Sequence, residues 1–126
     1  MTKTAFITGA TSGIGKATAK ILAKNGINLI INGRRASRLK ELKKQLMTSY
    51  SVDILELCFD VRNKEEVNNA INNLSNHWRK IDILVNNAGL AAGLDHIQDG
   101  NIDNWERMID TNIKGLLYVS RAILPN

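Results

Sequence analysis

The stretch Thr8-Gly9-Ala10-Thr11-Ser12-Gly13-Ile14-Gly15 decides the fold, because three glycines in a Gly-x3-Gly-x-Gly spacing join a short β-prone segment to a helical pattern. The β-prone segment covers residues 4–8, and the helix is expected over residues 12–24. The first N–H groups of a helix have no partner within it and carry partial positive charge, so they attract phosphate. Glycine lets the backbone approach such a group closely. The stretch therefore predicts a phosphate-binding turn, with a tight strand-to-helix turn without a ligand as the alternative.

Outward from this turn, strand-like and helix-like segments alternate along the chain. Further strands are predicted over residues 27–32, 52–60 and 81–85, and further helices over residues 37–47, from Asn63 onward, and over residues 103–124. The order β-α-β-α-β-α-β-α predicts an α/β fold with a parallel sheet and right-handed crossovers. Residues 90–101, which contain two glycines, are expected to form a loop beside the functional site.

Local patterns indicate which side chains are buried and where one helix begins. Asn63 is expected to cap the third helix, with Glu66 three residues later as in a capping box. Cys58 lies in an apolar stretch and is interpreted as a small core residue. The apolar positions that recur at helical spacing in residues 12–24 are Ile14, Ala17, Ile21 and Leu22.

Composition narrows the class of protein. The chain has 126 residues, which suits one domain, and a formal net charge of +5. The positive charge is local, because residues 1–63 hold 11 basic and 4 acidic side chains whereas residues 64–126 hold 6 and 8. A single cysteine excludes a disulfide within the chain, and two distant histidines give no support for a zinc site. Without a signal-peptide pattern or an apolar run of ~20 residues, a soluble cytoplasmic protein with no membrane partner is expected.

Two motifs together resemble a known enzyme family. Residues 8–15 and the sequence Asn86-Asn87-Ala88-Gly89 resemble the single-domain short-chain dehydrogenases/reductases, and the resemblance covers all 126 residues. Residues 81–90 and 105–115 are similar to the branch that oxidises L-serine and other 3-hydroxy acids with NADP. The resemblance implies a Rossmann-like, doubly wound parallel sheet, with strand order 3-2-1-4 in the part present and truncated before a fifth strand.

The resemblance also implies where the phosphates of a dinucleotide cofactor bind. The pyrophosphate would lie over Ser12, Gly13 and Ile14, at the start of the first helix. Gly9 and Gly15 would serve the geometry of the turn and the packing of the helix on the sheet.

The adenosine half of the cofactor is assigned in the same way. Asp60 would accept a hydrogen bond from the adenine amino group, and a strand-end carboxylate that caps a turn is the alternative. Asn86 is expected to tie neighbouring strands together rather than to contact the ligand. The cofactor-binding residues implied, apart from those that select the dinucleotide, are Gly9, Thr11, Ser12, Gly13, Ile14, Gly15, Asp60, Val61, Asn87, Ala88 and Gly89.

The end of the second strand is expected to select the dinucleotide. A carboxylate there would accept a hydrogen bond from the ribose 2′-hydroxyl and select NAD. This chain instead has Asn32-Gly33-Arg34-Arg35, with two guanidinium groups and no acid. Because Arg binds phosphate oxygens bidentately, the sequence predicts NADP over NAD, with Arg34 on the 2′-phosphate and Arg35 near adenine or sharing the charge. Two solvated loop arginines are the alternative.

The reactive end of the resembling family is only partly found. There, a Ser holds the substrate oxygen, a Tyr passes a proton, a Lys four residues later lowers the Tyr pKa, and an Asn in the long helix supports the proton relay. Asn112 matches that Asn, with a helix kink near Gly115 as the structural alternative. Neither Tyr50 nor Tyr118 has a Lys four residues later. Residues 1–126 are therefore expected to be the cofactor-binding part of a single domain, without the catalytic Ser, Tyr and Lys, and inactive alone.

The function expected of the complete protein is hydride transfer between NADP and a small 3-hydroxy acid or its semialdehyde. A 3-oxoacyl-carrier or other ketone reductase, and a non-catalytic dinucleotide-binding module, are the alternatives. Nucleic acid is not an expected partner, because the basic residues 34–44 lack interleaved aromatic side chains. In the family the long helix pairs with its copy in a second subunit, so the resemblance implies a homodimer or homotetramer.

Overall fold

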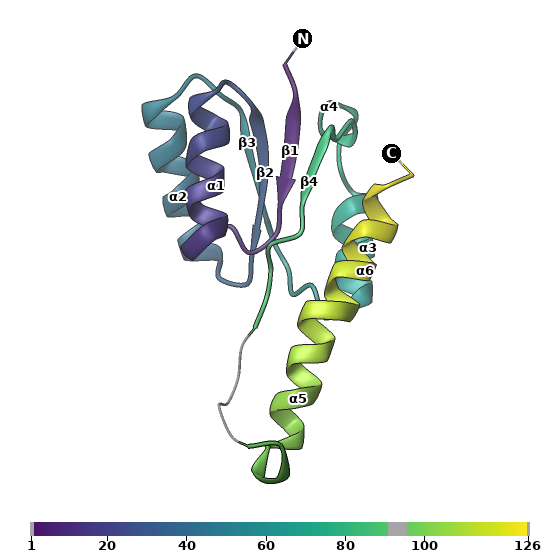
Figure 1. The fold of residues 1–126 in the computed structure, drawn as a ribbon. Helices are drawn as coiled ribbons and strands as arrows, with labels where there is room; N and C mark the ends of the chain where they lie inside the picture. Colours follow the sequence, from purple (N-terminus) through teal and green to yellow (C-terminus); the bar gives the residue numbers. More distant parts are fainter. Residues whose placement is uncertain (1, 91–95, 126) are drawn as a thin grey trace.

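The computed structural model describes residues 2–90 and 96–125, which form a four-stranded parallel sheet in the order β3-β2-β1-β4. The predicted sheet and its strand order are confirmed (Figure 1). The strands are β1 (Thr4–Ile7), β2 (Asn28–Gly33), β3 (Ile54–Cys58) and β4 (Ile83–Val85).

Helices cover both faces of this sheet, as a parallel sheet requires (Figure 1). On one face lie α1 (Gly13–Lys24) and α2 (Ala36–Ser49), and on the other lie α3 (Lys64–Asn72) and α6 (Leu116–Ile123). The shorter elements are α4 (Asn76–Arg79), which the sequence patterns did not predict, η1 (Ile97–Asp99), α5 (Ile102–Ile109) and η2 (Asp110–Gly115). No helix in the described part of the chain combines the length and apolar content needed to cross a membrane.

The two central strands place alternate side chains in two separate cores. Ala5 and Ile7 pack under α1 and α2, whereas Phe6 between them packs against α3 and α6. The register sets Phe6 beside Ile30 of β2 and Leu84 of β4, so that each core runs across several strands. This is the period-two alternation of a strand, applied to a sheet that is covered on both faces.

The outer strands are shorter than predicted, and most of their side chains are only partly buried. β3 begins at Ile54 rather than at residue 52, and β4 keeps only Ile83–Val85, whose side chains are half-buried. The interpretation of Cys58 as a core residue was wrong, since it is exposed at the end of β3 and its Sγ lies 3.5 Å from the Arg34 carbonyl oxygen. Cys58 is exposed because it ends β3, which is the edge strand of the sheet, and its apolar neighbours in sequence do not show this exposure.

The buried face of α1 also differs from the prediction. It consists of Gly15, Ala19 and Ala23, while Ile14 and Ile21 are 78% and 61% exposed. Small residues face the sheet because α1 packs close to the chain beneath it: a Cβ on Gly15 would lie 2.2 Å from the Gly9 carbonyl oxygen. Residue size, rather than apolar spacing, identifies the buried face of this helix.

The long helix predicted over residues 103–124 is present as three consecutive helical segments. It begins at Ile102 in α5, passes through the π-helical segment η2 and ends in α6 at Ile123. The described part of α5 buries no side chain and projects past the carboxyl end of the sheet (Figure 1). Gly115, at the end of η2, packs so closely on Val61 that a Cβ there would lie 2.6 Å from Val61 Cγ2.

The predicted start of α3 is confirmed in part. Asn63 Oδ1 accepts a hydrogen bond of 3.1 Å from the Glu66 backbone N–H, which is the first half of the capping box. In a complete box the Glu66 side chain would accept a hydrogen bond from the Asn63 backbone N–H. Here that N–H instead donates to the Asp60 carbonyl oxygen at 3.0 Å.

Thr8, directly after β1, joins the ends of the two strands β1 and β4. Its backbone N–H donates to the Val85 carbonyl oxygen at 3.1 Å. Its hydroxyl oxygen accepts from the backbone N–H groups of Asn87 and Ala88 at 3.0 and 2.9 Å. Thr8 is 2% exposed, so this single hydroxyl holds the segment after β4 in a region that is largely shielded from water.

Replacing Thr8 with Val tests this junction. The isosteric change keeps the volume but removes the acceptor of two backbone N–H groups, so we expect a loss of about 1–3 kcal/mol in the free energy of unfolding, measured with urea. Thr18→Val is the matched control, because the Thr18 hydroxyl only donates to Ile14 within α1, and about 0.5 kcal/mol or less is expected there. Equal losses for the two variants would contradict the assigned role of Thr8.

Candidate functional site

A cavity of about 200 Å³ lies at the carboxyl ends of the strands, between the turn that follows β1 and the segments that follow β2, β3 and β4. This is the edge at which open α/β sheets bind ligands. The predicted site residues that line it are Gly9, Thr11, Ser12, Arg34, Asp60, Val61, Asn87, Ala88 and Gly89. The lining residues that the sequence reasoning did not assign are Asn32, Gly33, Phe59, Arg62, Leu90 and Thr111.

The other predicted residues lie outside the lining. Gly13, Ile14 and Gly15 form the first turn of α1, with Ile14 exposed and Gly15 buried. Arg35 is exposed and immediately precedes α2. Part of the predicted loop, residues 91–95, lies outside the described residues, and η1 is in the remainder.

The glycine-rich turn is shaped by close approaches to its neighbours. Gly9 has a φ of 60°, in the left-handed region that favours glycine, and a Cβ there would lie 2.9 Å from Ala88 Cα. The Asn87 Nδ2 atom donates to the Gly9 carbonyl oxygen at 3.0 Å. The turn is therefore fixed against the segment that follows β4.

The start of α1 is suited to an anion. Ser12 lies in extended backbone before the helix, and its side chain makes no capping hydrogen bond. The first turn contains no acidic side chain. The partial positive charge of the helix N-terminus thus faces the cavity edge without a side-chain cap or a carboxylate to neutralise it.

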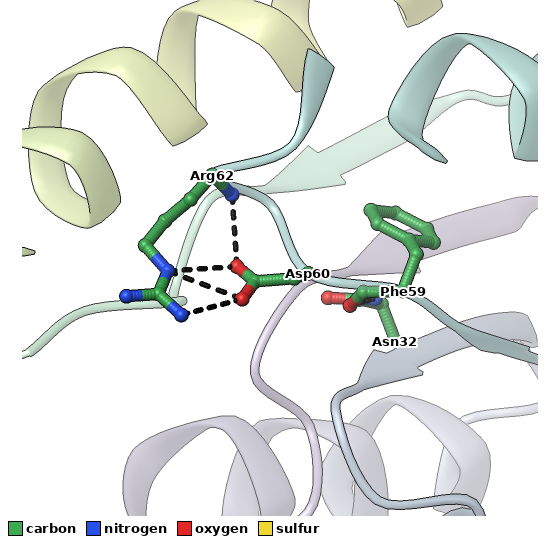
Figure 2. A network of polar contacts seen from close by, with 4 residues as sticks. All are labelled: Asn32, Phe59, Asp60 and Arg62. Carbon is green, nitrogen blue, oxygen red and sulfur yellow. Dashed lines mark hydrogen bonds and ion pairs between the residues drawn. The ribbon is translucent and has the colours of Figure 1, made fainter. Parts of the chain in front are cut away.

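Asn32 holds the ends of β2 and β3 together. It is 2% exposed, and its Nδ2 atom donates to the carbonyl oxygens of Leu57 and Phe59 at 3.2 and 3.1 Å. Figure 2 shows Asn32 beside Phe59, with Asp60 directly after it in the chain. An Asn that directly follows the apolar run of residues 29–31 is the sequence signal that would have identified this position.

Asp60 is paired with Arg62, which lies two residues further along the chain (Figure 2). The guanidinium donates to both carboxylate oxygens at 2.7–3.1 Å, and the Arg62 backbone N–H donates to Asp60 Oδ1 at 2.9 Å. The Asp60 carboxylate thus accepts from a backbone N–H of the turn that follows β3, which is the contact that the alternative interpretation of Asp60 as a turn cap describes. These Arg62 hydrogen bonds hold the pKa of the Asp60 carboxyl below its usual range, and the nearby charge of Arg34 acts in the same direction.

Asn112 lies on η2 and clamps the segment after β4. Its Oδ1 atom accepts from the Leu90 N–H at 2.8 Å, and its Nδ2 atom donates to the Leu90 carbonyl oxygen at 2.9 Å. Asn112 does not line the cavity, but it holds Leu90, which does. The expectation that Asn86 ties neighbouring strands together was wrong, because its Nδ2 atom donates to Ser120 Oγ on α6 at 3.1 Å. Asn86 does not line the cavity.

The charges around the cavity are not arranged for a metal. Arg34 lines the cavity, and Lys16 and Arg38 line a second one of about 220 Å³ that shares Thr11 with it. Among residues 2–90 and 96–125, no group of three or more His, Cys, Asp or Glu side chains is placed to hold a metal ion. The charged groups at the cavity suit an anionic ligand.

Arg62→Gln tests the ion pair through its dependence on pH. The lowered pKa of Asp60 contributes stability above the usual carboxyl pKa of ~3.9, and this contribution is lost as the pH falls through the lowered value. Since the pair is partly open to solvent, we expect the substitution to cost about 0.5–1 kcal/mol at neutral pH and less at ~pH 3, measured by urea unfolding. A loss that does not shrink in acid would contradict the pairing, and Lys114→Gln, which removes the exposed pair with Asp110, is the control.

Comparison with known proteins places this geometry in context. The profile of the family described as short chain dehydrogenase matches residues 3–126. A probable NADP-dependent dehydrogenase of Haemophilus influenzae is 46% identical over 125 residues, which are 99% of this chain and 48% of that protein. An NADP-dependent 3-hydroxy acid dehydrogenase of Salmonella typhi is 44% identical over 120 residues, 95% of this chain and 47% of that protein.

A solved structure extends the comparison to the fold. The closed form of a serine dehydrogenase complexed with NADP+ is 43% identical and superposes with a TM-score of 0.87, covering 97% of this chain and 48% of that one. The chain thus spans about half the length of the curated relatives it matches. The profile match over almost every residue, together with the sheet and the glycine-rich turn, shows that the chain belongs to the short chain dehydrogenase family.

Proposed function

We propose that the full-length protein transfers hydride between NADP and a small 3-hydroxy acid or its semialdehyde, and that the chain described here supplies the cofactor-binding part. The observation that carries the choice of cofactor is Arg34, which lines the cavity at the end of β2, where neither Gly33 nor Asn32 offers a carboxylate. The similarity to NADP-dependent 3-hydroxy acid dehydrogenases and to a serine dehydrogenase supports the substrate class.

The residues present fit such a cofactor. The uncapped start of α1 suits the pyrophosphate over Ser12, Gly13 and Ile14, and the Gly9 turn leaves no side chain in its way. Arg34 would bind the 2′-phosphate, with Arg35 adding charge from the start of α2. When bound, NADP supplies the hydride acceptor of the reaction.

The adenosine half would lie across the ends of β3 and β4. Asp60 and Val61 would face adenine, with the carboxylate of Asp60 kept ionised by Arg62. Asn87, Ala88 and Gly89 would line the ribose and the floor of the cleft. Holding a flat base between fixed strand ends positions the rest of the cofactor without a further conformational change.

Asn112 is proposed as a positioning residue at the reactive end. Its two hydrogen bonds to Leu90 fix the segment after β4 against η2, where the long helix departs from regular α-helical geometry. Tyr50 and Tyr118 lack a Lys four residues later, so the proton-transferring Tyr and its Lys are proposed to come from outside this chain. The chain alone is then expected to bind NADP without turning over substrate.

The exposed apolar side of the long helix is proposed to pair with a second copy in the full-length protein, giving a homodimer or homotetramer. Such a row of large exposed side chains is unusual on a monomer surface. Its members in the described part are Ile102, Trp105, Ile109, Ile113, Leu116, Leu117 and Leu124.

Kinetics of the full-length protein test the proposed reaction and its cofactor. With a 3-hydroxy acid such as L-serine, NADP+ is expected to be reduced and NAD+ to be a poor substitute. Arg34→Asp removes a charge-assisted contact worth about 1.5–3 kcal/mol, so the Kd for NADPH should rise about 10- to 150-fold and the preference should turn toward NADH. Lys40→Asp, with the same charge change on the exposed face of α2, is the control.

Two outcomes would contradict these assignments. If NADH binds the unaltered protein as tightly as NADPH, the role of Arg34 is wrong. If NADPH binds but no 3-hydroxy acid is oxidised, the protein is a reductase of another ketone or a non-catalytic binding module.

The pairing of the long helix is tested by light scattering during size-exclusion chromatography. Leu117→Glu places a charge on the proposed interface and is expected to convert the oligomer to a smaller species. Ile21→Glu, on the exposed face of α1, is the matched control and is expected to leave the mass unchanged. An unaltered protein that elutes as a monomer would refute the pairing.

A further inference from the structure

Gly33, the last residue of β2, is buried and lines the cavity beside Arg34. The backbone φ angle of Gly33 is not positive, so an L-residue could adopt the backbone conformation at this position. Space excludes it instead: a Cβ on Gly33 would lie 2.9 Å from Thr11 Cγ2, and the next neighbour is Leu39 Cδ2 at 3.4 Å. The Thr11 methyl group therefore lies too close for a side chain to begin at position 33 unless one of the two residues shifts.

The backbone that leads into Thr11 is held close to the end of β2. The Ala10 backbone N–H, one residue before Thr11, donates to the Asn32 carbonyl oxygen at 2.9 Å, which pins the turn to the end of β2. Threonine carries two heavy atoms on Cβ. In two of its three staggered rotamers, one of these atoms therefore takes the position that faces Gly33. The close contact between a Cβ at position 33 and Thr11 thus depends on the position of the whole turn. Shortening the Thr11 side chain is the most direct way to remove it.

This contact bears on the choice of cofactor. A carboxylate at the end of the second strand is the group that accepts from the ribose 2′-hydroxyl of NAD. We infer that Thr11 is a specificity-determining residue, whose methyl group keeps an acidic side chain out of position 33 and so leaves Arg34 as the group that this strand end presents. The inference rests on the proposed function, because it assumes that the adenosine ribose lies in this cavity.

The inference adds a coupling between two elements that the proposed function does not contain. Selectivity against NAD is set by the β1–α1 turn as well as by the end of β2. An acid at position 33 should therefore recognise the 2′-hydroxyl only when residue 11 is small. Neither substitution alone should produce an NAD-binding protein.

The experiment compares Gly33→Asp, Thr11→Ala and the double variant in the full-length protein, with NADH and NADPH binding followed by nucleotide fluorescence. Gly33→Asp alone is expected to weaken NADPH and to gain no affinity for NADH. The double variant is expected to bind NADH at least about 10-fold more tightly than Gly33→Asp does, the equivalent of one good hydrogen bond to the hydroxyl. Equal NADH affinity of the single and double variants would overturn the inference.

A second pair of variants separates packing from cofactor binding. Gly33→Ala adds only the Cβ, and its thermal unfolding midpoint without nucleotide should fall and be largely restored by adding Thr11→Ala. If Thr11→Ala does not restore it, Leu39 rather than Thr11 is the obstacle and the inference is wrong. If the midpoint is restored but no variant binds either nucleotide, the packing stands and the proposed function fails.

If Gly33→Asp does not fold but the double variant does, the steric part of the inference is supported. If the double variant also fails to fold, shortening Thr11 does not make room for the acid and the inference is overturned.

Discussion

The cavity depends on the absence of a side chain at Gly15. A Cβ there would lie 2.2 Å from the Gly9 carbonyl oxygen and 2.4 Å from Asn87 Nδ2, so α1 sits at a distance that no other residue allows. This approach brings the start of α1, the end of β1 and the segment after β4 to one point. The hydrogen bonds from Asn87 to Gly9 and from the Asn87 and Ala88 amides to Thr8 then lock the three together. A helix start that is pinned in this way would need no rearrangement to receive an anion.

Much of the positive charge of the chain follows the end of β2, next to the cavity. Residues 34–44 contain six basic side chains and one acidic one, and they begin where β2 ends. Arg34 faces the cavity, while Lys40 and Lys44 remain on the exposed side of α2 and act only as a long-range attraction for an anion. The pKa of Asp60 is lowered mainly by its hydrogen bonds to Arg62, and the charge of Arg34 acts in the same direction with a smaller effect.

The resemblance to the family predicted the sheet order and most of the residues that line the cavity. The position of the turn followed from the spacing of the glycines, which is a local property. Sequence patterns failed where burial depends on the exposure of a strand end or on how closely a helix packs, as for Cys58, Ile14 and Ile21. They also missed Arg62, since two neighbours in sequence show no pairing until the chain turns after β3. Asn86 was misplaced because its partner, Ser120, lies on a helix far along the chain.

Mapping amide chemical shifts by NMR while NADPH is added to the full-length protein tests the central claim most directly. The account predicts the largest changes at the turn of residues 9–15, at Gly33 and Arg34, at Asp60 and Val61, and at residues 87–89. Small changes are expected on the outer face of α2, at Lys40 and Lys44. Changes confined to that basic face, with the glycine-rich turn unaffected, would contradict the assignment of the cavity as the dinucleotide site.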